Sequence, residues 1–310
     1  MASALQLTPS GGTALFPPEL TNEMINLARG KSSLARLSNS VPVSFTGNTL
    51  FTFNLDKEVN VVGESGAKSN GGATLGSVTM SPVKVEYGVR ISDEFRYAAA
   101  ERRLPYLRQF AEGFAAKVAR GLDIMAFHGF NPRTGSASSI IGNRHFDSQV
   151  TQSATIATPA SGAQTDGNAA VEAAIALVQG SDQDVTGIAM APALRSILGA
   201  QKYDDGRSMF PDLEWGAAPG NIRGLPVEVN STVSFGTGSL NRAYVGDFQH
   251  YFRWGYARNV EITMIPYGNP DNDADAGDLA GHNQVFLRGE AYIGWAILLP
   301  AAFAKIVAAS

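Results

Sequence analysis

The sequence predicts an α+β fold, with strands and helices gathered in separate stretches of the chain. Three observations support this prediction. Apolar and polar residues alternate in two separate stretches, one long stretch has apolar residues at helical spacing, and one short stretch has the pattern of a helix, a buried strand and a second helix. A chain of 310 residues can form one large domain or two of ordinary size, and it can bury a core without disulfides.

Composition narrows the classes of function. The net charge is -4, and no run of Lys and Arg offers the counterion release on which non-specific nucleic-acid binding depends. Only 17% of residues are charged while 33 are glycine, which suits a surface that faces neighbouring molecules. The first ten residues lack the pattern of a signal peptide, and no apolar run has the length of a membrane span. We therefore expect neither secretion nor membrane insertion.

The N-terminal region reads as an arm followed by helix. Residues 1–18 are small and polar and show neither the period of a strand nor that of a helix, so we expect an extended arm. Residues 19–37 carry leucines at mostly helical spacing and are interrupted by Gly30, which predicts one helix or two short ones. The apolar stripe of this segment needs a partner surface.

The period then changes to that of strands, and we interpret residues 41–92 as one long hairpin. Its tip, residues 63–76, contains five glycines and should be mobile in a lone subunit. A two-stranded ribbon of this length is marginal in water unless another molecule covers it. We therefore expect the apolar residues of both strands to contact a neighbouring subunit: Phe51, Phe53, Leu55, Val83, Val85 and Tyr87.

The strongest helical pattern runs from Leu104 to Met125, and the helix should end before Gly129. Pro105 fits the first turn of such a helix, where its missing N–H costs nothing. The charged side chains of this stretch should mark its solvated face: Arg108, Glu112, Lys117, Arg120 and Asp123.

The second half of the chain predicts a helix–strand–helix unit followed by strands. The expected helices and strand of the unit are 168–179, 185–191 and 192–198, with a proline at the start of the second helix. Strand patterns follow at 225–229, 243–248, 259–265 and 285–299, and an acidic loop at 271–278 interrupts them.

No motif carries conventional catalysis. The segment Gly63-Glu-Ser-Gly66-Ala-Lys68-Ser69 lacks the spacing of a phosphate-binding loop, and there is no nucleophile elbow. The acidic loop resembles a calcium loop only in its alternation, because His282 stands where a bidentate Glu is required; a solvated loop is favoured. The four histidines are scattered. We expect no enzyme activity, no cofactor and no metal.

Taken in order, these parts resemble the major capsid protein of tailed bacteriophages, the Hong Kong 97-type fold. The most specific patterns lie in the C-terminal third: Gly224-Leu-Pro-Val227, Ala243-Tyr-Val-Gly-Asp-Phe248, Asn283-Gln-Val-Phe-Leu-Arg288-Gly-Glu290 and Pro300-Ala-Ala-Phe303. The resemblance implies six parts. They are an N-terminal arm with a short helix (1–40), an E-loop hairpin (41–92), a peripheral domain with the spine helix (93–154), an axial domain (155–259), closing strands of the peripheral domain (260–300) and a C-terminal segment (301–310).

The same resemblance implies a function. Subunits would form hexamers and pentamers of an icosahedral head that encloses double-stranded DNA without sequence-specific binding. The protein would belong to the virion and assemble in the host cytoplasm, with scaffold, portal or decoration proteins as separate partners.

Some members of this family cross-link covalently, with a lysine of the hairpin joined to an asparagine of a neighbour and helped by a glutamate. Lys68, Asn283 and Glu290 are the candidates here. The alternative, which we favour, is that Asn283 caps a turn and Glu290 pairs with an arginine such as Arg288.

Two other functions stay open at this point. An encapsulin-like nanocompartment shell would share the fold and enclose an enzyme cargo. A soluble α/β enzyme is the alternative from another class, although the sequence offers no set of acid, base and nucleophile for it.

Overall fold

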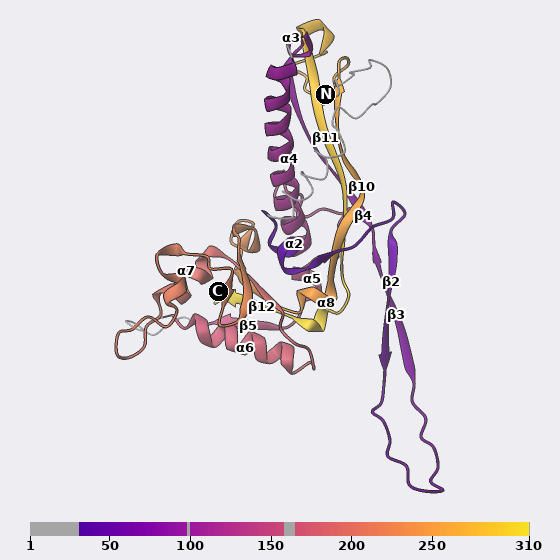
Figure 1. The fold of residues 1–310 in the computed structure, drawn as a ribbon, viewed down its shortest axis with the longest axis vertical. Helices are drawn as coiled ribbons and strands as arrows, with labels where there is room; N and C mark the ends of the chain where they lie inside the picture. Colours follow the sequence, from indigo (N-terminus) through magenta and orange to yellow (C-terminus); the bar gives the residue numbers. More distant parts are fainter. Residues whose placement is uncertain (1–30, 98–99, 158–164, 310) are drawn as a thin grey trace.

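The structure is a computed structural model that describes residues 31–97, 100–157 and 165–309. In this part of the chain, two sheets and a protruding hairpin make up the fold, as Figure 1 shows. The expected arm, residues 1–18, and most of the helix expected over 19–37 lie outside the described residues. What is described of that helix is α2 (Ser33–Leu37). None of the described helices is long and apolar enough to cross a membrane.

The four-stranded sheet has the order β1-β10-β11-β4 and is antiparallel except for the short β1. The long helix α4 stands along it, as the upright part of Figure 1 shows. Phe114 of α4 packs so closely on Gly289 of β11 that a Cβ there would lie 2.9 Å from its ring. The elements are β1 (Asn39–Ser40), β4 (Pro82–Ser92), α3 (Glu94–Tyr97), α4 (Ala100–His128), β10 (Phe252–Ile265), η3 (Ala280–His282) and β11 (Gln284–Ile297).

The hairpin is shorter than predicted, and its second strand is a different one. β2 (Asn48–Leu55) pairs with β3 (Ala73–Met80), whereas β4 pairs along its whole length with β11. Val83 of β4 is buried in the core between sheet and helix. The prediction that residues 83–91 return along 51–55 was therefore wrong, because alternation identifies a strand but not its partner.

Helix α4 also departs from the prediction, in where it begins and in which face is solvated. It begins at Ala100 and has 29 residues, so Pro105 lies inside it and leaves one carbonyl of the preceding turn without its helical partner. Residues 100–103 are Ala, Glu, Arg and Arg, which are good helix formers and extend the helix before the proline. At the other end, the helix stops before Gly129, as predicted. Asp123 does not belong to a solvated face: it is fully buried.

The six-stranded sheet has the order β5-β12-β9-β6-β8-β7. The segment 301–310, predicted as a separate C-terminal part, contains β12, which lies between β5 and β9 inside this sheet. β10 starts at Phe252, before the predicted boundary at 259. The elements are β5 (Ser153–Ile156), α6 (Gly167–Gln179), β6 (Gly187–Met190), α7 (Pro192–Ala200), η1 (Pro211–Gly216), β7 (Asn221–Ile222), β8 (Leu225–Val229), η2 (Ser231–Ser234), β9 (Asn241–Gly246), η4 (Pro300–Ala302) and β12 (Phe303–Ala308).

An aromatic cluster joins the two sheets. Phe146 of α5 (Phe146–Gln149) lies within 5.0–6.0 Å, centroid to centroid, of five rings, including that of Phe303 in the six-stranded sheet and that of Phe252 in the four-stranded sheet. Phe248 of α8 (Phe248–Tyr251) belongs to the same cluster. Because each ring is fully buried, the joint is a continuous core rather than a flexible linker.

Candidate subunit-contact site

One face of the hairpin is apolar and exposed. Phe51, Phe53 and Leu55 of β2 lie on this face, and their exposed fractions are 69%, 67% and 64%. The pairing sets Phe53 directly opposite Leu75 of β3, which is also exposed. In Figure 1 the hairpin extends away from both sheets, and none of the described residues of its own subunit covers this face. A contiguous apolar stripe of this kind marks an interaction surface.

The base of the hairpin is anchored in its own subunit. Met80 is fully buried with Val43 and Ala296, and Leu50 and Val78 pack on this small cluster. Leu50, Val78 and Met80 lie on the face of the hairpin opposite to Phe51. Because this face packs on the body of the subunit at the base of the hairpin, the apolar stripe faces away from the body.

The three candidates from β4 do not share this exposed position. Val83 is buried, and Val85 packs against the core under α4. Tyr87 is half-exposed and lies 6.4 Å from the ring of Phe110 of α4, centroid to centroid. Val83 and Val85 therefore stabilise their own subunit, and the prediction that they contact a neighbour was wrong.

Asp123 anchors the first described segment of the chain. Its carboxylate accepts hydrogen bonds from the backbone N–H groups of Ser33 and Leu34 at 2.9 and 3.3 Å and from the Ser32 hydroxyl at 2.5 Å. Asn230 and Thr232 donate two more, at 3.3 and 3.1 Å. Burial raises the pKa of this carboxyl, and the five donors oppose that effect. The carboxylate thus ties the start of α2 to α4 and η2.

A second polar cluster lies at the joint between the sheets. The Asp147 carboxylate lies 2.7 Å from Nδ1 of His128, and it accepts hydrogen bonds from the Tyr244 hydroxyl and the Asn241 amide at 2.5 and 2.7 Å. His128 Nε2 lies 2.8 Å from the carbonyl oxygen of Thr232, so both ring nitrogens of His128 face acceptors. Burial alone would raise the pKa of Asp147, but these donors together lower it.

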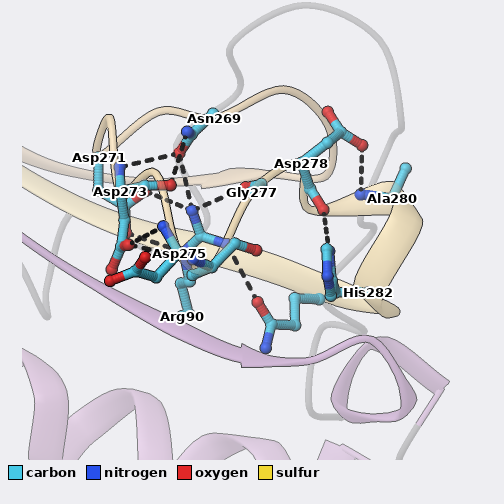
Figure 2. Close-up of polar contacts among 11 residues, drawn as sticks. Arg90, Asn269, Asp271, Asp273, Asp275, Gly277, Asp278, Ala280 and His282 are labelled. Atoms are coloured by element: carbon cyan, nitrogen blue, oxygen red, sulfur yellow. Dashed lines mark hydrogen bonds and ion pairs between the residues drawn. The ribbon is translucent and has the colours of Figure 1, made fainter.

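Arg90 organises the acidic loop, as Figure 2 shows. Its guanidinium forms a bidentate pair with Asp271 at 2.6 and 2.8 Å and donates further hydrogen bonds to Asn269, Gln284 and the carbonyls of residues 276 and 277. The hydrogen bond from Arg90 lowers the pKa of Asp271 to about 2. The acidic loop is exposed, as expected, and it is organised around a cation of its own chain.

The cross-link candidates are not brought together within one subunit. Asn283 is exposed and has a left-handed backbone conformation at the end of η3, with φ of 51°. Glu290 lies seven residues further, about 24 Å along an extended strand, and it pairs with Lys84 and Arg288 at 2.9 Å each. Lys68 belongs to the exposed loop at the hairpin tip. The expected turn at Asn283 and the expected pairing of Glu290 with Arg288 are both present.

Sequence reasoning missed three residues that the geometry singles out. Leu75 lies in a strand whose glycine and serine hide its alternation, so no pattern in the sequence pointed to it. Arg90 was assigned only to a strand face, and no local pattern pairs it with residues 180 positions away. Asp123 lies in a helix, and its charge suggested a solvated position. The serines at 32 and 33 are typical of a helix start, and the donors at such a start need an acceptor, but nothing in the sequence names Asp123 as that acceptor.

Comparison with known proteins decides the family. Residues 12–308 match the sequence profile of the phage capsid family. The chain belongs to the phage capsid family. Among solved structures, this capsid protein is similar to a chain from Mycobacterium phage Ogopogo, with 31% identity, a TM-score of 0.74, and 90% of this chain and 92% of that chain covered. No curated protein sequence matches it.

Two further structures share the fold of this capsid protein. A chain from Gordonia phage Cozz has 24% identity and a TM-score of 0.74, with 90% of this chain and 87% of that chain covered. The capsid of an empty GTA particle computed with C5 symmetry has 14% identity and a TM-score of 0.63, with coverages of 99% and 96%. The protein is a major capsid protein with a Hong Kong 97-type fold, a structural component of an icosahedral virion shell. The comparisons give no support to a nanocompartment shell or a soluble enzyme.

Proposed function

We propose that this capsid protein assembles into hexamers and pentamers and that the resulting shell encloses double-stranded DNA. The observation that carries the proposal is the exposed apolar face of the hairpin. A hairpin that extends from the body is marginally stable alone, and a neighbour that covers the face of Phe51 and Phe53 would stabilise it. The apolar face of the hairpin would bind a different surface of the neighbouring subunit, so the contact is heterologous. Heterologous contacts form rings when the rotation between subunits closes.

We assign the parts of the fold to roles in this assembly. The hairpin 48–80 is the E-loop and reaches a neighbouring subunit. The four-stranded sheet with α4 is the peripheral domain, and the six-stranded sheet with α6 and α7 is the axial domain. Phe51, Phe53, Leu55 and Leu75 form the contact, and Tyr87 lies at its margin.

The charge of the chain supports enclosure of DNA rather than tight binding. A net charge of -4 gives the subunit no general attraction to phosphate. DNA would be packed by a separate motor and held by the closed wall. Assembly would take place in the host cytoplasm, and separate scaffold, portal or decoration proteins would act as partners. The role is structural, with no catalytic step.

The experiment is expression of the full chain, followed by gel filtration and negative-stain electron microscopy. Closed shells or rings support the proposal. A compact monomer at all salt and protein concentrations, also after co-expression with a neighbouring gene, contradicts it.

A pair of matched variants tests the hairpin contact. Phe53→Asp places a charge on the exposed apolar face, while Thr74→Asp places the same charge on the opposite face of the same hairpin, where the side chain is also exposed. We expect both variants to fold, and only Phe53→Asp to block assembly. Equal assembly of the two variants would show that the apolar face is not the contact.

A further inference from the structure

Trp215 is the most exposed large apolar side chain of the described residues. The chain has three tryptophans; Trp254 and Trp295 are buried in the core, whereas Trp215 is fully exposed. Tryptophan is rarely left in water without a function, and it is enriched among the residues that dominate protein interfaces.

The backbone holds this side chain outward at a cost. Trp215 has φ of 57° and ψ of 20°, the left-handed region that a residue with a bulky side chain disfavours, and it interrupts η1. Two neighbours fix the segment: Leu213 is buried, and Arg195 of α7 donates a hydrogen bond of 2.8 Å to the carbonyl of Gly216. The indole is therefore a fixed protrusion and not the end of a loose loop.

A groove of about 300 Å³ lies on the other side of the helix that supports this protrusion. Its lining is mainly apolar and consists of Thr165, Ser196, Ile197, Ala200 and Gln201. At about 100° per residue, Ile197 and Ala200 lie roughly 160° and 140° around the helix from Arg195. The protrusion and the groove thus occupy opposite faces of α7.

A protrusion and a groove on opposite faces of a subunit suit head-to-tail contacts in a ring. A protrusion and a recess on opposite sides of one subunit cannot meet within that subunit, but they can meet between successive copies related by rotation, and such head-to-tail contacts form a ring when the rotation closes. One polar side chain at the groove is buried: the Gln201 amide N–H donates to Asp166 at 3.0 Å, and its buried carbonyl oxygen has no hydrogen-bond partner among the described residues.

We infer that Trp215 of one subunit binds in the α7 groove of the next subunit of the same ring. This inference rests on the proposed function, since it requires rings of this chain. It assigns the contact within a ring to the six-stranded sheet with its helices, and it is independent of the hairpin contact.

Intrinsic fluorescence tests the inference directly, because Trp215 is the one tryptophan that a soluble quencher such as acrylamide can reach in the folded subunit. We expect acrylamide to quench the indole of Trp215 in unassembled subunits and to lose access to it in assembled particles. Trp215→Phe identifies the signal, because it removes the accessible component and leaves the two buried indoles.

Two arginine variants localise the contact. Ala200→Arg fills the groove from an exposed helical position, and Ala176→Arg places the same side chain on an exposed position of α6 outside the groove. We expect Ala200→Arg to form no rings, or particles in which the indole stays accessible, while Ala176→Arg behaves like the wild type. Loss of a central tryptophan contact, as in Trp215→Ala, should weaken ring formation about 30-fold.

The outcomes separate this inference from the proposed function. Wild-type particles in which Trp215 stays as accessible as in subunits would overturn the inference and leave the shell proposal intact. Ala200→Arg particles that shield Trp215 fully would also overturn it. A wild-type chain that forms neither rings nor shells would remove both.

Discussion

Removal of the Asp123 carboxylate should strongly destabilise the start of α2. Asp123→Ala removes an acceptor of five hydrogen bonds, and two of the donors are the backbone N–H groups of Ser33 and Leu34, which cannot turn elsewhere. A buried donor left without a partner costs about 1–3 kcal/mol. Two such donors give a cost of roughly 3 kcal/mol, which corresponds to about a hundredfold increase in local opening of α2.

Hydrogen exchange of full-length subunits measures this opening. We expect the amides of residues 33–38 to exchange about a hundredfold faster in Asp123→Ala than in the wild type, while α6 is unchanged. Asp166→Ala is the matched control, because Asp166 accepts from the N–H of Ala169 at 2.9 Å at an exposed helix start. Loss of this exposed cap costs about 1 kcal/mol and should speed exchange about fivefold in the first turn of α6. Because Asp166 also accepts from Gln201 of the segment after α7, exchange there can change too, but α2 should keep the wild-type rate.

The result that refutes the reasoning is a folded Asp123→Ala subunit whose α2 amides exchange at the wild-type rate. If the alanine variant does not fold, Asp123→Asn replaces it. The amide keeps one of the two oxygens and the volume of the side chain, so it should give an intermediate increase in exchange at the same residues. An increase spread evenly over the whole chain would also contradict a local anchor.

Three other outcomes follow from the structure. Val83→Asp should destabilise the subunit by about 3–5 kcal/mol, because it buries an unpaired charge, whereas Phe53→Asp should leave the thermal midpoint unchanged; circular dichroism decides, and a folded Val83→Asp variant contradicts the burial. The Asp271 carboxyl should titrate at about 2 by NMR and return toward 3.8 in Arg90→Ala. The pKa of Asp271 is lower in the folded chain than in the unfolded chain. The Arg90–Asp271 pair therefore stabilises the loop above pH 4, and this stabilisation is lost as the pH falls through 2. A pKa near 3.8 for Asp271 in the wild type would contradict the pairing. On a denaturing gel, mature particles should give one band at 32.7 kDa, because Glu290 is already paired within its subunit; a ladder of multimers would instead support the cross-link.

Periodicity predicted the elements whose environment is decided locally. The helix α6 and the strand β8 each bury one face against a single neighbouring layer, so the spacing of apolar residues in the sequence records that face. The end of α4 also followed from Gly129, which has φ of 69° and suits a helix terminus.

The failures arose where position in the fold decides the environment. The last two turns of α4, up to His128, lie between both sheets and are buried on all sides, so Asp123 could not be assigned to a solvated face by its charge. The partner of β4 could not be predicted either, because alternation does not identify the partner of a strand and the residues of β3 gave too weak a pattern to be recognised as the second strand of the hairpin. Of the contact candidates, those on β2 and the half-exposed Tyr87 stay predictions, whereas Val83 and Val85 pack in the core of their own subunit.

The central position of β12 has a consequence for synthesis of the subunit. Residues 303–308 fill the gap between β5 and β9, and the ribosome makes them after every other strand of that sheet. While they are missing, β9 and β5 each present an unpaired edge, and the aromatic joint lacks Phe303. The six-stranded sheet therefore cannot close on a nascent chain. A chain cut short by premature termination before residue 303 cannot present Trp215 and the α7 groove on a finished sheet, so truncated subunits would be kept out of the growing shell.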